Sequence, residues 1–521
     1  MKIKRIGARG ATGYDAALAA AAGGALALYG SYRAFRALRQ HVRLCAALQH
    51  VQWAPGKHPA VGHTITLARA VWSFPCTWDL LCAWSRAHEP APSRVQIFAN
   101  QCVATSEPSD LRTIFTSERS SFMKDVAFAY EPFIDVLGTG LVTAEGELWW
   151  QQRKRVAHAF RVEILDFIVP IALRAAERLK SKLCRVSKNG EQIDMNEEFR
   201  HLTLQVIGEA ILSMRADESD RVFPFLYLPV MDEANRRSLQ PWRKHLPLPA
   251  SIRYRRKLSQ LNQYVTSIIR NRIQFHETNG PPKNEKMDIL DRVITSIPLE
   301  ELHTKQTETQ LCYEVKTFVL AGHETSASML TWTLFELSRN PDYLQRVRDE
   351  GFKSSQKSAS SSTSPPSKWP TDKEGVEQLD FTLASLKESL RKYSIVPVVT
   401  RKLVRESNLG GTTIPAGTTI ICALQAVHHR EDLWPKPGEY NPTRFSDGND
   451  KKIDQYAFVP FIQGPRNCLG QHLALLEARA VLQSLVQDFD FEPAEGTGDR
   501  HVQNIPIAPA NGMPMRVRHR K

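Results

Sequence analysis

The sequence predicts a mainly α-helical chain with a minor β-region. Residues 161–300 follow a mostly helical pattern with polar breaks, and a long apolar helix is expected between Leu302 and Asn340. Two short runs, Val95–Phe98 and Gln101–Ala104, have the composition of strands in a small sheet. The length of 521 residues allows more than one domain.

Composition and charge narrow the classes of function. Apolar residues make up 42% of the chain, which is ample for a large core. The net charge is +13, but acidic residues are interspersed throughout, so we do not expect a nucleic-acid-binding protein. The excess of basic residues either forms a solvated surface without a partner or attracts an anionic membrane or an acidic redox partner. Eight scattered cysteines, without a CxxC pair, exclude a zinc framework or a disulfide scaffold and fit a reducing compartment.

The N-terminal segment has the charge pattern of a membrane anchor. Residues 1–13 are basic, residues 14–32 are uncharged apart from Asp15, and residues 33–60 form a basic linker that ends in a proline- and glycine-containing hinge. The uncharged stretch is near the lower length limit for a bilayer span, and tyrosines lie at its ends. The alternatives are a buried amphipathic helix or an organelle transit segment. Residues 61–521 then form the main folded domain.

A tryptophan and an arginine mark the helix expected near residue 150. Trp149 and Arg153 lie one helical turn apart on one face, where an indole N–H and a guanidinium can together bind carboxylate oxygens. Trp150 and Lys154 repeat the spacing, so the register can also be shifted by one residue. The simplest alternative is a packed tryptophan beside a solvated basic run.

Polar residues interrupt the long apolar helix between Leu302 and Asn340. Gly322 has no side chain, so the helix can open beside its backbone, and the next residues include a carboxyl group at Glu324 and a hydroxyl at Thr325. A charged residue in an apolar helix needs a reason. The alternative is an ordinary helix with a surface glutamate and a threonine bonded to the preceding turn. We interpret His323 as a packing residue.

The start of this helix and the segment after it carry local signals. Thr307–Gln310 has the form of a capping box at the helix start. Residues 353–370 are rich in Ser and Pro and predict a disordered surface loop inside the domain. Glu388 and Arg391 follow at a spacing that lets the two side chains bond on one helix, and Arg444 comes later in an Asn-Pro-Thr-Arg-Phe run.

Cys468 lies where a turn-rich loop meets an apolar helix. Helix N-terminal N–H groups and the helix dipole favour the thiolate, which is the form of cysteine that binds metals. Gly464 and Gly470 leave space on both sides of the sulfur for a flat macrocycle, and Arg466 offers a charge for a carboxylate. The bland alternative is a buried structural cysteine.

The residues Phe461, Gly464, Arg466, Cys468 and Gly470 match the pattern FxxGxRxCxG, which resembles the haem-ligand motif of the cytochromes P450. The motifs WxxxR, AGxETS, ExxR and PxRF precede it in the order typical of that family. The resemblance covers the chain from about Pro55 onward. It implies the single-domain P450 fold, a helical triangular prism around a haem.

The resemblance also implies a role for each motif. Cys468 is the axial ligand of a haem b that is otherwise held non-covalently. The propionates bind Arg466, the Trp149–Arg153 pair and Arg401, which follows Pro397–Thr400 in an expected strand. Gly322 borders the oxygen groove, and Glu324 and Thr325 deliver the protons that the reaction needs. Glu388, Arg391 and Arg444 form a buried cluster that shapes the ligand loop, where Thr443 replaces a common glutamate.

The implied activity is a monooxygenase reaction that hydroxylates an unactivated C–H bond of a lipophilic substrate, such as a fatty acid, sterol or terpenoid. Electrons come from NADPH-cytochrome P450 reductase or another donor, because no flavin or nicotinamide module follows Cys468. The expected location is a membrane, chiefly the endoplasmic reticulum with a cytosolic catalytic domain, with plastid or mitochondrial membranes as alternatives.

Two other functions remain open from the sequence. One is a P450-type enzyme that rearranges peroxides without oxygen or a reductase, and the other is a non-catalytic haem-binding protein. The pair Glu324 and Thr325 argues against both. Some fatty-acid ω-hydroxylases of the family attach haem covalently through a glutamate at the position of Ala321, so we expect no such link here.

Overall fold

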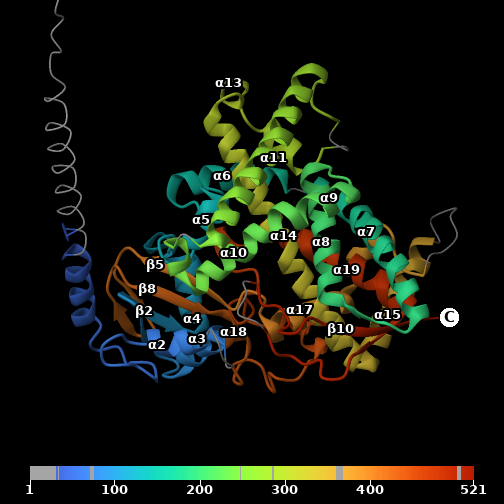
Figure 1. Cartoon of the computed structure of the whole chain (residues 1–521). Coiled ribbons are helices and arrows are strands. Elements are labelled where there is room, and N and C mark those ends of the chain that lie inside the picture. Colours follow the sequence, from blue (N-terminus) through green and yellow to red (C-terminus); the bar gives the residue numbers. More distant parts are fainter. Residues whose placement is uncertain are drawn as a thin grey trace, which may run out of the picture.

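The computed structural model describes residues 31–32, 35–70, 76–160, 162–246, 248–283, 287–359, 368–501 and 506–520. Residues 1–13 and nearly all of the predicted anchor at 14–32 lie outside this set. Within the described part, none of the helices combines the length and the apolar character needed to cross a bilayer. Helices build most of the molecule, as the sequence predicts, and small sheets lie at two of its sides (Figure 1).

Helices lie in nearly every part of the chain. In chain order they are α2 (Thr64–Ala70), α3 (Thr77–Arg86), α4 (Pro108–Arg112), α5 (Glu131–Leu137), α6 (Gly146–Ala159), α7 (Val162–Asn189), α8 (Met195–Leu212), α9 (Ala216–Val222), α10 (Leu228–Leu239), α11 (Pro249–Asn279), α12 (Ile289–Thr295), α13 (Leu299–Leu302), α14 (Lys305–Arg339), α15 (Pro341–Ala359), α16 (Lys373–Glu377), α17 (Asp380–Tyr393), α18 (Leu424–His428) and α19 (Gln471–Asp488). A further helical stretch covers residues 35–47.

The strands are short and form three sheets. They are β1 (Ser93–Ile97), β2 (Asn100–Thr105), β3 (Phe122–Lys124), β4 (Gln192–Asp194), β5 (Val398–Leu403), β6 (Ser407–Leu409), β7 (Thr412–Ile414), β8 (Thr419–Ala423), β9 (Phe489–Pro493) and β10 (Pro514–His519). The largest sheet has the order β1-β2-β8-β5-β3, and only its β2–β8 pair is parallel. The other two sheets are β4-β10-β9 and the hairpin β6-β7.

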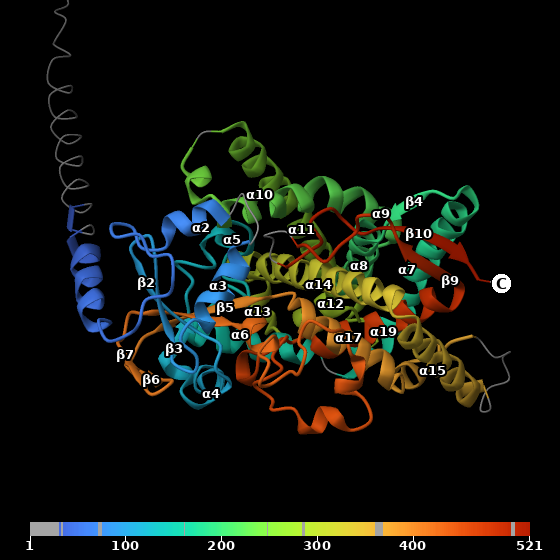
Figure 2. The same ribbon diagram turned by 90° about the horizontal axis from the view of Figure 1, so that it is seen from below.

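Helix α14 lies between the five-stranded sheet and the three-stranded sheet, as Figure 2 shows. It packs along α8 and also contacts α11, α17 and α19. The main apolar core joins side chains of α7, α8, α14, α17 and α19. At its centre the buried Trp332 of α14 stacks on Tyr393 of α17, with ring centroids 4.0 Å apart. This packing holds α14 in place, so its middle section is a fixed wall.

Several local predictions are confirmed. The two runs predicted as strands form the hairpin β1–β2, in which Val95 pairs with Cys102, and the run before Arg401 belongs to β5. Polar breaks end α7 at Asn189 and α11 at Asn279, each followed by a glycine with positive φ. The short strand β4, directly after the first break, was missed because three residues carry too little pattern.

Two local predictions need correction. The long helix is capped by Thr304, whose hydroxyl accepts from the Thr307 backbone N–H, so the cap lies three residues before the predicted box. The predicted loop at residues 353–370 is helical up to Ala359, because α15 continues through its serines. Ser354 supports this extension by donating to the Gly375 carbonyl. Residues 360–367 lie outside the described residues.

Candidate active site

A hydrogen bond and close steric contacts fix the backbone of the loop that carries Cys468. The Cys468 N–H donates to the Phe461 carbonyl at 2.9 Å, and Phe461 packs against the main core. Gly464 has φ +76°, and a Cβ there would lie 2.4 Å from the Phe115 carbonyl oxygen. A larger residue at Gly464 is therefore excluded by both its conformation and its neighbour. Gly470 differs from Gly464 in its backbone conformation, because its φ of −84° is one that any residue can adopt.

Cys468 presents its side chain to an opening between this loop and the rest of the molecule. The residue is exposed, although protein atoms surround the opening closely enough to desolvate the thiol. Burial raises the pKa of the Cys468 thiol, while the Gly470 backbone N–H and the charge of Arg153 lower it. The backbone N–H at the helix N-terminus therefore lowers the pKa of the thiol, as predicted, but burial raises this pKa by more. A Cβ on Gly470 would lie 4.0 Å from the sulfur, an ordinary van der Waals contact, so the structure itself does not require a glycine there.

Trp149 and Arg153 of α6 flank the Cys468 loop. Arg153 donates to both the carbonyl and the side-chain oxygen of Asn467, at 2.7 and 2.6 Å. Trp149 is 4% exposed, whereas Trp150 is 38% exposed and pairs with Lys154 at the surface. The structure thereby decides the register in favour of Trp149.

Positive charge gathers beside Trp149. The Arg466 guanidinium lies 5.2 Å from the centre of the Trp149 ring and donates to the Phe122 carbonyl and to Glu145. The buried Arg401 acts electrostatically on Arg466. Lys124 belongs to the same group: burial lowers its pKa to about 7, Glu145 opposes this, and Arg466 and Arg401 lower it further.

This cluster of cations fits an anionic group. Glu145 is the carboxylate that balances Arg466, and the Arg466 Nε is buried without a hydrogen-bond partner among the described residues. Mutually repelling cations around a buried, unused donor are stable only if a negatively charged partner offsets them. The propionates of the haem that the sequence resemblance implies would supply such a charge.

On α14, the predicted motif splits between two faces. Ala321 and Thr325 lie in the wall of a cavity of about 660 Å³, and the Thr325 hydroxyl donates to the Ala321 carbonyl at 2.6 Å. Glu324 lies on another face, buried, with its carboxylate 3.5 Å from Arg200 of α8. Burial raises the pKa of Glu324 to about 7, and Arg200 opposes the shift. The surface position considered for Glu324 is therefore excluded.

Gly322 has a packing role in this structure. Helix α14 is continuous through the motif, and a Cβ on Gly322 would lie 2.5 Å from Cδ1 of Ile207 in α8. The predicted opening of the helix beside Gly322 is not seen; the glycine instead allows α8 to approach. His323 is completely buried against Tyr227, and burial lowers its pKa to about 3, so it is a neutral packing residue as expected.

The structure brings Glu388, Arg391 and Arg444 together. Arg391 and Glu388 form a bidentate pair, both bonds being 2.8 Å long, and neither side chain has any exposed area. Arg444 lies 3.4 Å from the same carboxylate. Arg391 also donates to the carbonyls of His428 and Pro437, which lie in the segment leading to the Cys468 loop. Thr443 bonds locally to Asn441 and leaves this cluster intact.

The cavity beside Thr325 is mostly apolar. Aromatic and aliphatic side chains of α3, α5, α14 and the β5 region form its wall, among them Trp78, Phe128, Phe133, Leu320 and Val399. The charged or titratable side chains in the wall are Tyr130, Glu131, Arg237 and His245. An elongated apolar molecule matches this lining, in which Arg237 already pairs with Asp135 and Glu233.

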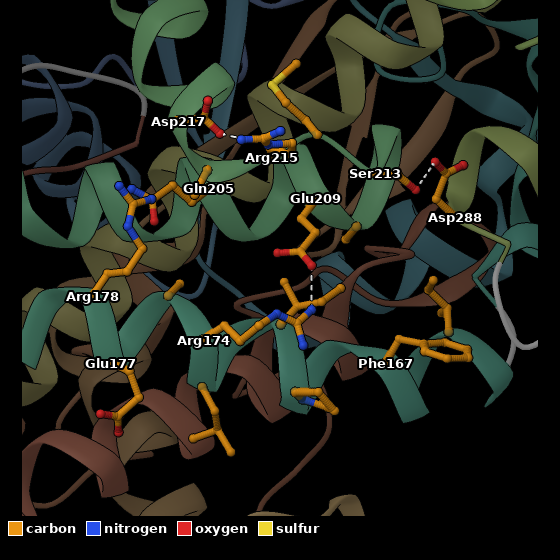
Figure 3. A pocket seen from close by; sticks show the side chains of 18 of the residues that line it. Phe167, Arg174, Glu177, Arg178, Gln205, Glu209, Ser213, Arg215, Asp217 and Asp288 are labelled. Carbon is orange, nitrogen blue, oxygen red and sulfur yellow. Dashed lines mark hydrogen bonds and ion pairs between the residues drawn. The ribbon is translucent and has the colours of Figure 1, made fainter.

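A second, larger hollow of about 980 Å³ lies between α7, α8 and α9 (Figure 3). Its charged side chains already bond to each other: Arg174 to Glu209, Arg215 to Asp217, and Ser213 to Asp288. This hollow contains none of the predicted site residues, and its polar groups are satisfied within the protein. We therefore place the site at the smaller cavity.

Sequence reasoning missed the residues that support the site. Glu145, Lys124 and Asn467 bind or balance the predicted arginines, and Arg200 pairs with Glu324. A usable signal existed only for Glu145, which directly precedes Gly146 at the start of the WxxxR helix and caps it.

Comparison with known proteins decides the family. The sequence model described as Cytochrome P450 matches residues 86–511. The chain belongs to the cytochrome P450 family. It is therefore an oxidoreductase of the monooxygenase class with a haem-thiolate iron cofactor.

Individual relatives of this P450 are distant. It is 28% identical to "Cytochrome P450 4c21" of Blattella germanica over 75% of this chain and 79% of that protein. It is 27% identical to "Leukotriene-B4 omega-hydroxylase 3" of Mus musculus, covering 78% of each. Among solved structures, the cytochrome P450DA heme domain aligns with 90% of this chain and 98% of its own length, at 21% identity and a TM-score of 0.75. That likeness shows the P450 fold.

Proposed function

We propose that this P450 hydroxylates an unactivated C–H bond of a long-chain lipid that carries a carboxylate, with electrons from a separate reductase. The observation that carries the proposal is the apolar cavity, which has Thr325 in its wall. Arg237 in the same wall already pairs with Glu233 and Asp135, so the cavity supports the apolar chain of the substrate and not its anionic end. The similarity to a protein named as a leukotriene-B4 ω-hydroxylase supports a lipid acid.

We assign the haem contacts to five residues. Cys468 ligates the iron, and Trp149, Arg466, Arg401 and Arg153 provide N–H donors or charge at the propionates or beside the sulfur. Phe461, Gly464 and Gly470 shape the loop around that ligand. When bound, the haem supplies activation of dioxygen and attack on the C–H bond, and thiolate ligation promotes O–O cleavage.

We assign proton handling to Glu324 and Thr325. Thr325 holds a hydroxyl at the cavity wall, and Glu324 holds a carboxyl at the α8 side of the same helix. A group whose pKa is near 7 can both bind and release a proton at neutral pH. Transfer from the Glu324 side to the cavity requires the Thr325 hydroxyl to leave the Ala321 carbonyl, which costs one hydrogen bond.

The side chain of Ala321 is a methyl group that faces the cavity, so it cannot form an ester to haem. Haem extracted with acidified solvent should therefore leave the protein completely. Haem that stays attached to the polypeptide would contradict this assignment.

The proposed location is the membrane of the endoplasmic reticulum, with residues 14–32 as anchor and the catalytic domain in the cytosol. The anchor lies outside the described residues, so the support comes from sequence: a stretch nearly free of charge between basic segments. The net charge of +13 suits docking of an acidic reductase and contact with anionic lipids.

The decisive experiment uses the haem-loaded full chain. Titration with a long-chain fatty acid should shift the Soret band, and addition of NADPH, reductase and oxygen should yield a hydroxylated acid by mass spectrometry. The methyl ester of the same acid is the control and should bind more weakly, because it lacks the negative charge. Product from organic hydroperoxides alone, with none from oxygen and reductase, would favour peroxide rearrangement; no product from any lipid pool would favour a non-catalytic haem protein.

A further inference from the structure

Three metal-ligating side chains converge at the rim of the substrate cavity, outside the haem site. They are Cys76, the N-cap residue of α3, Asp79 in the first turn of that helix, and His501 near the C-terminal end of the chain. The Cys76 sulfur lies 3.4 Å from Nε2 of His501, and Oδ1 of Asp79 lies 3.3 Å from the same nitrogen. In the part of the chain that the structure describes, no other three side chains of these types meet so closely.

We propose that Cys76, Asp79 and His501 bind a zinc ion, with water as the fourth ligand. The donor set has one thiolate, one imidazole and one carboxylate, which suits a borderline-soft divalent cation. Ligands at tetrahedral zinc, with bonds of about 2.0–2.3 Å, lie about 3.3–3.6 Å from one another. The two measured separations fall in that range, so zinc fits with little movement of the side chains.

The bonds around the cluster hold the ligands in orientation. Oδ2 of Asp79 accepts the backbone N–H of Cys76 at 3.0 Å, which directs the other oxygen, Oδ1, toward His501. Cys76 is 4% exposed and directly precedes the first residue of a ten-residue helix. Partners of this kind, which orient the ligands, are typical of metal sites.

A catalytic thiol triad does not explain the geometry. In such a triad the imidazole bonds the nucleophile through one nitrogen and the orienting carboxylate through the other. Here the thiol and the carboxylate both approach Nε2 of His501. Convergence on one point is the arrangement that a shared cation requires.

The site connects two distant parts of the chain beside the substrate cavity. Thr77, Trp78 and Leu81 of the same helix line that cavity, and so does Pro506, which follows His501 by five residues. A zinc ion would cross-link α3 to the C-terminal segment at the cavity rim. Because binding energy adds to folding energy when the site exists only in the native chain, the ion should also stabilise the protein.

The test uses the haem-loaded full chain, treated with a chelator and then dialysed against Zn²⁺. We expect one zinc per chain by mass spectrometry, and a zinc K-edge absorption spectrum with one sulfur at about 2.3 Å and nitrogen or oxygen neighbours at about 2.0–2.1 Å. The variants Cys76→Ser and His501→Gln should weaken binding at least tenfold, because losing even a supporting partner commonly costs about 10–100-fold.

Matched controls separate this site from adventitious binding. Cys82→Ser changes a buried cysteine of the same helix, and His519→Gln changes an exposed histidine near the C-terminus; both should keep the zinc. The carbon monoxide difference spectrum checks that each variant is folded around haem. Zinc without a sulfur neighbour, less than a tenth of an equivalent bound, or unchanged binding in Cys76→Ser and His501→Gln would each overturn the proposal.

Discussion

The Cys468 loop and the Ala321–Ser326 segment of α14, to which we assign the two sides of the proposed active site, are stabilised differently. The loop is fixed by backbone contacts and charged bonds: Cys468 to Phe461, Arg153 to Asn467, and Arg466 to Phe122. The α14 side chains have fewer partners, since Thr325 has one hydrogen bond and Glu324 one ion pair of 3.5 Å. The difference fits the proposed roles, in which the loop fixes the sulfur of Cys468 and the α14 side chains transfer protons beside the substrate.

Replacing the sulfur gives the largest expected effect. In Cys468→Ser the hydroxyl is a much weaker donor to iron, so we expect loss of the thiolate-type carbon monoxide difference spectrum and of product formation. Cys422→Ser, a fully buried cysteine in β8, is the control and should keep both. A normal spectrum in Cys468→Ser would show that another residue binds the iron.

The second variant removes the carboxylate behind the loop. Glu388→Ala leaves the fully buried Arg391 without its ion partner, which should cost about 3–5 kcal/mol in free energy of unfolding. Urea unfolding and haem retention measure the loss. The exposed pair of Arg346 and Asp447 provides the control, because Asp447→Asn should cost less than about 1 kcal/mol. Similar costs for both variants would contradict a structural role for the buried cluster.

The third variant tests the α14 side of the comparison. Thr325→Ala should keep the carbon monoxide spectrum but lower product per electron consumed by at least about tenfold, because a positioned proton donor is lost. Thr333→Ala removes a hydroxyl that is bonded to the preceding turn of α14 in the buried core, and should stay coupled. NADPH consumption, hydrogen peroxide release and product formation are measured for both variants. Tight coupling of NADPH consumption to product formation in Thr325→Ala would contradict a role of Thr325 in proton delivery.

The pH profile tests Glu324. Burial raises its pKa to about 7, so the carboxyl is largely protonated below that pH and ionised above it. If the neutral acid delivers protons, turnover should fall as pH rises through 7, and Glu324→Gln should flatten this part of the profile. Glu197→Gln, which changes a more exposed partner of Arg200, should keep an inflection but move it to lower pH, because the Glu197 charge helps to raise the pKa of Glu324. An unchanged inflection in Glu324→Gln would assign it to another group.

The smallest effect concerns Gly322. A Cβ there meets Ile207, so Gly322→Ala should destabilise the native chain, whereas the same change in an Ile207→Ala background should be neutral or stabilising. The double-mutant cycle should show a coupling energy of about 0.5–3 kcal/mol. Additive effects would mean that the glycine serves the helix opening that the sequence suggested.

Local signals predicted the helices and strands where they were strong. The 3.6-residue pattern and the Asn-Pro end located α14, and glycines marked the ends of α7 and α11. The same method placed the α14 cap three residues late, because Thr304 and Thr307 are equally good capping residues in sequence. It also extended the serine-rich loop into α15, where tertiary contacts override weak helix propensity.

The sequence by itself determined the family and the order of the site motifs, and it predicted the haem ligand, because these depend on residue types at short, fixed spacings. Only the tertiary structure decided that Trp149 faces inward, that Glu324 pairs with Arg200, and that Gly322 packs against Ile207. It also brought Cys76 and Asp79 to His501, across more than 400 residues of chain. The physical reason is that such contacts depend on how helices cross and how the chain closes, which no local spacing records.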